Sequence, residues 1–147
     1  MCGQMTELAP DLRLHHVGFV VTDIAACVEG FALSLQAKWS GEVFVDPLQR
    51  VKVTFLTVSS DQALVELVEP LGEDSPVQRF LQERSGGLHH LCYEVSDAEA
   101  QLKRIRACRG LIVSRPKPAI AFGGRRVAWA LTQQRLLLEF LEKGEGT

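Results

Sequence analysis

Two histidine–glutamate pairs are the residues of this chain best suited to carry chemistry. His16 and Glu66 lie in the first half, and His90 and Glu139 lie in the second, at similar separations of 50 and 49 residues (66 − 16 and 139 − 90). Each glutamate interrupts an apolar stretch, LVELV or LLEFL. A carboxylate buried without a partner costs several kcal/mol, so each glutamate needs a counter-charge. A glutamate that needs a counter-charge occurs twice, each time together with a histidine. This repetition predicts one cation shared by all four side chains.

Two imidazoles and two carboxylates suit a divalent ion such as Zn²⁺, Co²⁺, Ni²⁺, Mn²⁺ or Fe²⁺, and the ligand types do not select one of these. Four protein ligands on an octahedral ion leave two positions open for water or a chelating substrate. Taken singly, a histidine on a strand is usually a hydrogen-bonded structural residue, and a single glutamate can face solvent on an edge strand. The repeated set favours the metal over these readings.

An internal duplication supports the pairing. The segment LHHVGFVVTDIAACV, from Leu14, matches LHHLCYEVSDAEAQL, from Leu88, and ALVELVE, from Ala63, matches LLLEFLE, from Leu136. The two frame shifts, 74 and 73 residues, are nearly equal. Because successive strand side chains point to opposite faces, only one histidine of each HH pair can face a common centre. His16 and His90 lie deeper in their apolar runs, which favours them over His15 and His89. Glu69 and Glu142 also repeat, and we expect them in solvent at strand ends.

Each half is expected to form a βαβββ module. Apolar runs at residues 16–21 and 90–95 predict strands, and Thr22 and Ser96 are candidate N-caps for the helices that follow. Three more strands are expected at residues 42–45, 51–58 and 63–69, and again at 111–114, 126–131 and 136–141. A linker helix should begin at Ser75 and Pro76.

A four-stranded sheet with one helix leaves an apolar face uncovered, so the two modules should pack together. The expected fold class is α+β, with two tandem βαβββ modules packed around a shared metal site. One domain is predicted at residues 12–143. It comprises a first module at about 12–70, a linker at 71–87 and a second module at about 88–143.

The overall composition excludes several classes of function. A formal net charge of −2 gives no reason to expect a nucleic-acid partner, and the apolar runs are too short to cross a membrane. The start, MCGQMTELAP, has no basic and apolar secretory signal. The four cysteines form no CxxC motif, so we expect reduced thiols and a cytoplasmic protein.

Several motifs resemble the vicinal oxygen chelate superfamily, which includes glyoxalases, bleomycin resistance proteins and dioxygenases. Within it, the chain is most similar to the methylmalonyl-CoA epimerase family. The likeness lies in the opening LHHVGFVVTDI, the middle segment VELVEPLGEDSPVQRFLQERSGGLHHLCYEV and the closing LLLEFLE. The resemblance implies metal ligands at His16, Glu66, His90 and Glu139, with either Glu or Gln at the second position in the family. It also implies a homodimer.

By this resemblance the protein is a divalent-metal-dependent isomerase acting on a small molecule, either an acyl-CoA or another substrate with an acidic C–H. The ion would chelate two oxygens of the substrate and stabilise the enolate formed when an acidic α-proton leaves. Glu139 is the candidate acid/base on one face of the substrate carbon. Some relatives have a glutamate on the third strand for the other face, but here RVKVTFLTV has Lys52, Val53 and Thr54, so Glu66 is the candidate. The basic residues Lys117, Arg125 and Arg126 are either phosphate contacts or ordinary solvated side chains.

Other activities of the superfamily are alternatives. A lactoylglutathione lyase of the glyoxalase I type uses the same four-ligand plan, and a non-catalytic antibiotic-binding protein uses the same fold without a metal. A dioxygenase site needs two histidines and only one carboxylate, which disfavours that class. The PLGEDSP linker favours the epimerase. Fold alone does not decide among these activities.

Overall fold

The computed structural model describes residues 12–144, which form two compact units. The first unit is residues 16–89, and the second unit comprises residues 12–15 together with residues 90–144. The division falls within two strands, β1 (Arg13–Val20) and β6 (Gly87–Val95). His16 and His90, the two candidate ligands, are each the first residue after a boundary.

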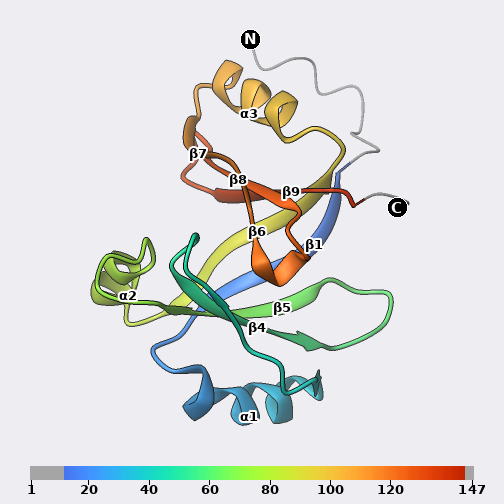
Figure 1. Cartoon of the computed structure of the whole chain (residues 1–147), viewed down its shortest axis with the longest axis vertical. Helices are drawn as coiled ribbons and strands as arrows, with labels where there is room; N and C mark the ends of the chain where they lie inside the picture. The colour runs from blue at the N-terminus through green and yellow to red at the C-terminus, as the bar shows by residue number, and fades with distance from the viewer. Residues whose placement is uncertain (1–11, 145–147) are drawn as a thin grey trace. The chain divides into compact units, whose positions relative to one another are not determined.

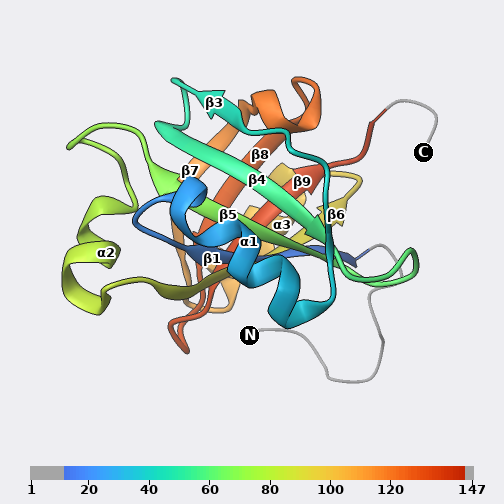
Figure 2. The ribbon, with the colours of Figure 1, turned by 90° about the horizontal axis from the view of Figure 1, so that it is seen from below.

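The first unit contains a sheet with the order β2-β4-β5-β1, and β3 pairs with β4. β1 and β5 are parallel, and β4 and β5 are antiparallel. Helix α1 lies against this sheet (Figure 2). After β1, the elements are α1 (Ile24–Leu35), β2 (Lys38–Trp39), β3 (Phe44–Asp46), β4 (Val51–Thr57), β5 (Leu64–Pro70) and α2 (Gln78–Arg84).

The second unit repeats this arrangement, with α3 against a sheet of the order β6-β9-β8-β7 (Figure 1). After β6, its elements are α3 (Ala98–Ala107), β7 (Leu111–Pro118), a short 3-10 helix (Ile120–Phe122), β8 (Arg126–Leu131) and β9 (Leu137–Glu142). The predicted α+β fold of two βαβββ modules is confirmed. In the first module, the second strand is divided into β2 and β3.

Helices α1 and α3 each cover one face of their sheet with apolar side chains. In the first unit, Ile24 and Val28 of α1 pack with Leu56 and Leu67. In the second, Ala98 and Leu102 of α3 pack in a core that the other side chains of β6, β8 and β9 complete: Leu91, Tyr93, Val95, Ala128, Ala130, Leu138 and Phe140. Because side chains alternate along a strand, the residues between these core positions point to the face without a helix. This is the face that carries the candidate ligands.

The helix starts differ from the sequence-based expectation by one residue. Asp23 and Asp97, rather than Thr22 and Ser96, are the N-caps, and their carboxylates accept hydrogen bonds from Ala26 N (3.4 Å) and Ala100 N (3.1 Å). A carboxylate caps as well as a hydroxyl and also complements the positive end of the helix dipole.

The linker helix begins at Gln78, two residues after Pro76. Ser75 is buried, and its Oγ accepts from Val77 N (3.5 Å) while its carbonyl accepts from Gln78 N (3.1 Å). Ser75 therefore forms the turn that precedes α2 and does not cap it as predicted.

Glu69 is not solvated at its strand end as expected. Its Oε1 accepts a hydrogen bond from Ile24 N, the first residue of α1 (2.8 Å), and its Oε2 lies 3.5 Å from Lys52 Nζ. A free N–H at a helix start needs such an acceptor. Glu69 thus ties β5 to α1. Its counterpart Glu142 pairs with Arg126 of the neighbouring strand.

We expect Glu69→Ala to lower the free energy of unfolding by about 1–2 kcal/mol, because it removes a charged acceptor from a helix N-terminus. Glu142→Ala is the matched control and should cost less than about 1 kcal/mol, the usual value of a partly exposed ion pair. Urea unfolding of the two variants measures both. Equal losses would contradict the role assigned to Glu69.

Two of the four cysteines can be assigned a state, and both Cys27 and Cys92 are free thiols, as expected. Burial, together with the nearby Asp23 carboxylate, raises the pKa of the Cys27 thiol. Among the helices of residues 12–144, none has the length and apolarity that crossing a membrane requires.

Candidate metal centre

The first unit brings its histidine and glutamate together through parallel strand pairing. His16 on β1 aligns with Leu64, and Gly18 aligns with Glu66 on β5. The His16 Nε2 and Glu66 Oε1 atoms are 3.4 Å apart. His16 is completely buried and Glu66 is 4% exposed. Gly18 has no side chain to separate the imidazole from the carboxylate.

The second unit builds the same pair from β6 and β9. Cys92 aligns with Glu139, and the His90 Nε2 and Glu139 Oε1 atoms are 3.3 Å apart. Both residues are 4% exposed. The duplication thus places a buried imidazole against a buried carboxylate, through the same ring nitrogen, in both units.

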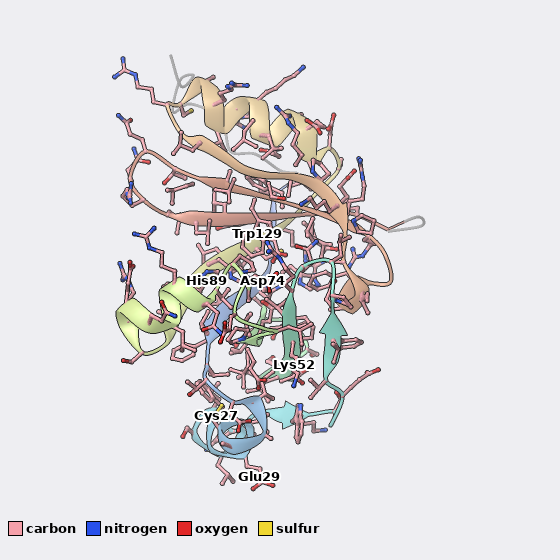
Figure 3. The ribbon with its side chains drawn as sticks, turned by 60° about the vertical axis from the view of Figure 1, so that its left-hand side comes forward. Cys27, Glu29, Lys52, Asp74, His89 and Trp129 are labelled. Carbon is pink, nitrogen blue, oxygen red and sulfur yellow. The ribbon has the colours of Figure 1, made fainter. Side chains whose placement is uncertain are left out.

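Each glutamate also faces an aromatic residue that the sequence reasoning missed. Phe55 on β4 is the antiparallel partner of Glu66, and Trp129 on β8 is the partner of Glu139. Phe55 contacts the ring of His16 edge to face, with centroids 5.7 Å apart, and Trp129 contacts that of His90 at 4.7 Å. Figure 3 shows Trp129 on the side of its sheet away from α3. A signal was present, because Phe55 and Trp129 are separated by 74 residues, the repeat shift.

The donor set and spacing of each pair fit two neighbouring positions on a divalent ion. Imidazole nitrogen and carboxylate oxygen bind such ions at about 2.0–2.2 Å, so ligands about 90–110° apart are separated by about 2.9–3.6 Å. The observed 3.4 and 3.3 Å lie in this range. They exceed the usual N–H···O distance of about 2.7–3.2 Å. The residues present therefore fit a metal.

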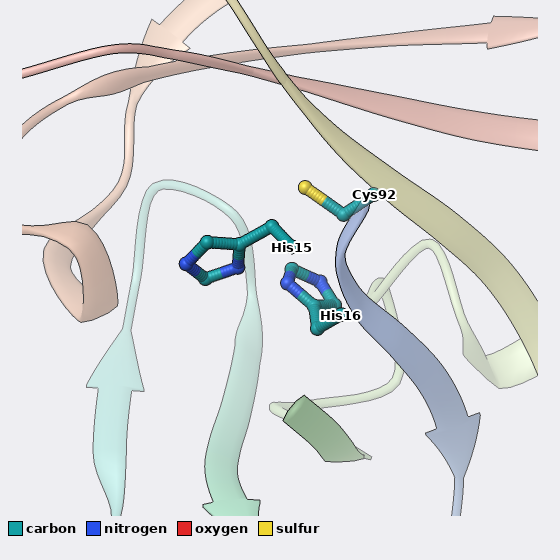
Figure 4. Close-up of side chains that lie close together, drawn as sticks. All are labelled: His15, His16 and Cys92. Atoms are coloured by element: carbon teal, nitrogen blue, oxygen red, sulfur yellow. The ribbon is translucent and has the colours of Figure 1, made fainter. Parts of the chain in front are cut away.

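The neighbouring histidines have other surroundings. The ring of His15 lies edge to face on Phe122, with centroids 5.5 Å apart, and one of its nitrogens is within 4.8 Å of Cys92 Sγ (Figure 4). His89 packs in the same way on Phe80 of α2, at 5.0 Å. Both histidines are half-buried. Their positions agree with the choice of His16 and His90 as the residues that pair with glutamate.

The third strand of the first unit presents an apolar surface beside Glu66. Val53 and Phe55 point to the same face as Glu66, while Thr54 points to the α1 side. Thr54 Oγ1 accepts from Trp39 Nε1 (2.7 Å) and donates to the Glu42 carbonyl. Among the described residues, β4 therefore brings no carboxylate to this face.

Two of the three basic residues considered for phosphate binding are engaged within the second unit. Arg125 Nη1 lies 2.9 Å from Glu94 Oε2, and Arg126 pairs with Glu142. The pairing with Glu142 raises the pKa of Arg126. Lys117 is exposed on β7. Of the three, Lys117 is the side chain that remains for an external anion.

Comparison with known proteins identifies the class. The model of the glyoxalase/bleomycin resistance protein/dioxygenase superfamily matches residues 15–129, so the chain belongs to this superfamily. The resemblance seen in the motifs is thereby confirmed.

Relatives within the superfamily include several epimerases. The chain is 34% identical over 116 residues to an ethylmalonyl-CoA/methylmalonyl-CoA epimerase of Cereibacter sphaeroides, covering 78% of this chain and 84% of that protein. It is 35% identical over 95 residues to the human mitochondrial methylmalonyl-CoA epimerase, spanning 64% of this chain and 52% of the human protein. The crystal structure of the Mycobacterium tuberculosis methylmalonyl-CoA epimerase is similar, with a TM-score of 0.79 at 26% identity, covering 95% of this chain and 94% of that one.

Proposed function

We propose that this protein is a divalent-metal-dependent epimerase that moves the α-proton of a 2-carboxyacyl-CoA thioester of the methylmalonyl-CoA type. In this proposal His16, Glu66, His90 and Glu139 together hold one ion. The observation that carries it is the duplicated pair, a buried imidazole 3.3–3.4 Å from a buried carboxylate in each unit. The Cereibacter relative supports the substrate class, because its name specifies malonyl-type CoA thioesters.

The ligand types restrict the metal to a class of divalent ions and do not select one member of that class. Mixed imidazole and carboxylate ligands accept Zn²⁺, Co²⁺, Ni²⁺, Mn²⁺ and Fe²⁺. A bound ion supplies Lewis-acid stabilisation of the negative charge that develops when the α-proton leaves, worth several kcal/mol. The proton transfers would be carried out by side chains of the protein.

The acid/base roles go to the two glutamates. Epimerisation requires a proton to leave one face of the α-carbon and return to the other, so two groups are needed. Glu139 would serve one face. Because β4 brings no carboxylate to the Glu66 face, Glu66 itself would serve the other. A positioned general base contributes about 10²–10⁴-fold to rate. The apolar Val53 and Phe55 beside Glu66 would exclude water from that carboxylate.

Deuterium exchange tests the proposal. Metal-loaded protein is incubated in D₂O with methylmalonyl-CoA, and loss of the α-proton signal is followed by NMR. We expect exchange well above that of a chelator-treated sample of the same protein. Exchange no faster than in the chelated sample would rule out the epimerase. The thiohemiacetal of methylglyoxal and glutathione, the lyase substrate, serves as the specificity control and should not be consumed.

A further inference from the structure

We infer that Phe55 and Trp129 are positioning residues that hold the two imidazoles with Nε2 toward the glutamates. This inference rests on the proposed metal site and adds residues to it. Its basis is contact geometry repeated in two units that share little sequence on these strands. The aligned segments VKVTFLT and RRVAWAL agree only in a valine two residues before the aromatic residue.

The first observation is register. Backbone pairing places each aromatic residue directly opposite its glutamate, Phe55 against Glu66 and Trp129 against Glu139. Side chains opposite each other on antiparallel strands are about 4.5–5.5 Å apart at Cβ and lie on one face. Each aromatic side chain therefore lies next to the carboxylate that pairs with the neighbouring histidine. The strand pairing, and not a flexible loop, sets this position.

The second observation is the ring contact itself. The planes of His16 and Phe55 are inclined at 69°, and those of His90 and Trp129 at 78°. Such edge-to-face contacts are favourable and specific in direction. An imidazole that rotated about its side-chain bonds would lose the contact and turn Nε2 away from the carboxylate. The aromatic ring thus restricts the histidine to the orientation that ligation requires.

A purely structural role predicts a different result. Elsewhere in the first unit, Phe19 and Phe31 make the same kind of contact, with centroids 5.0 Å apart, and no histidine takes part. They pack with the core under α1. Phe31→Leu removes an aromatic pair of equal type without touching an imidazole. It is therefore the matched control for packing loss.

Cobalt affinity is the first measurement. Each folded variant competes with a chelator for Co²⁺, and its dissociation constant is compared with that of the original protein. Phe55→Leu and Trp129→Leu should each weaken binding by about 2- to 10-fold, the equivalent of one aromatic pair. The conservative Phe55→Tyr and Trp129→Phe should restore affinity. Phe31→Leu should lower the melting temperature with no change in affinity. Unchanged affinity in both leucine variants, or equal weakening in Phe31→Leu, would overturn the inference.

Nuclear magnetic resonance of the metal-free protein gives a second measurement that does not need metal binding. Proton–nitrogen correlation spectra of the imidazoles should show one ordered ring each for His16 and His90. In Phe55→Leu only the His16 ring, and in Trp129→Leu only the His90 ring, should broaden or shift its tautomer balance. Rings that stay unchanged in both variants would refute the inference. If the protein binds no Co²⁺ but shows these ring effects, the metal proposal is wrong and the inference about the two aromatic residues stands.

Discussion

Glu139→Ala is expected to leave the protein with no bound divalent metal and no α-proton exchange above the chelated control. The substitution removes one carboxylate from the second unit, where Glu139 Oε1 faces His90 Nε2 at 3.3 Å. If the two pairs share one ion, loss of either pair abolishes binding altogether. If each pair held its own ion, His16 and Glu66 would retain half of the metal. Mass spectrometry of the metal content per protein molecule distinguishes complete loss of metal from retention of half the original amount.

His89→Ala is the control for that experiment. His89 precedes a proposed ligand by one residue, but its ring packs on Phe80 and not on a glutamate. We expect metal content to be unchanged and exchange to be retained. If His89→Ala and Glu139→Ala behave alike, the assignment of His90 rather than His89 to the site is wrong.

Removal of the metal should destabilise the fold strongly. An ion that binds only the folded chain stabilises it by about 4 kcal/mol when its free concentration is a thousand times its dissociation constant. For a chain of this size that corresponds to a melting temperature lower by about 8–16 °C after chelation. The buried carboxylates give the physical reason, since removal of the ion takes away a positive charge that would compensate their negative charges.

Calorimetry with and without a chelator measures this effect, and adding the ion back should restore the transition. Glu139→Ala provides the reference, because a chain that cannot bind metal should melt at the same temperature in both conditions. A melting temperature of the original protein that does not respond to chelation would contradict a structural contribution from the ion. Exchange activity measured on the same samples shows whether the two losses occur together.

The duplicated modules are similar in framework and different in detail. Gly18 and Cys92 occupy matching positions beside the two glutamates, as do Phe55 and Trp129. The small residue on one side and the aromatic residue on the other recur, but their sizes differ between units.

Local sequence was sufficient to predict the α+β fold and the pairing of His16 with Glu66 and of His90 with Glu139. Apolar runs, helix-start signals and a 74-residue repeat are encoded in neighbouring residues. A charged residue inside an apolar strand is conspicuous because its burial is costly. That all four side chains share one ion remains a prediction.

Tertiary structure decided the features that depend on contacts between distant segments. Glu69 accepts a hydrogen bond from Ile24 N at the start of α1, 45 residues earlier, and Arg126 forms an ion pair with Glu142. Phe55 and Trp129 lie beside the glutamates because of the strand register. A shift of the pairing by one residue would turn each ring to the opposite face of the sheet. No local pattern reports register, since pairing energy is spread over whole strands. The sequence alone therefore identified the imidazoles and carboxylates, and only the folded sheets identified the rings beside them.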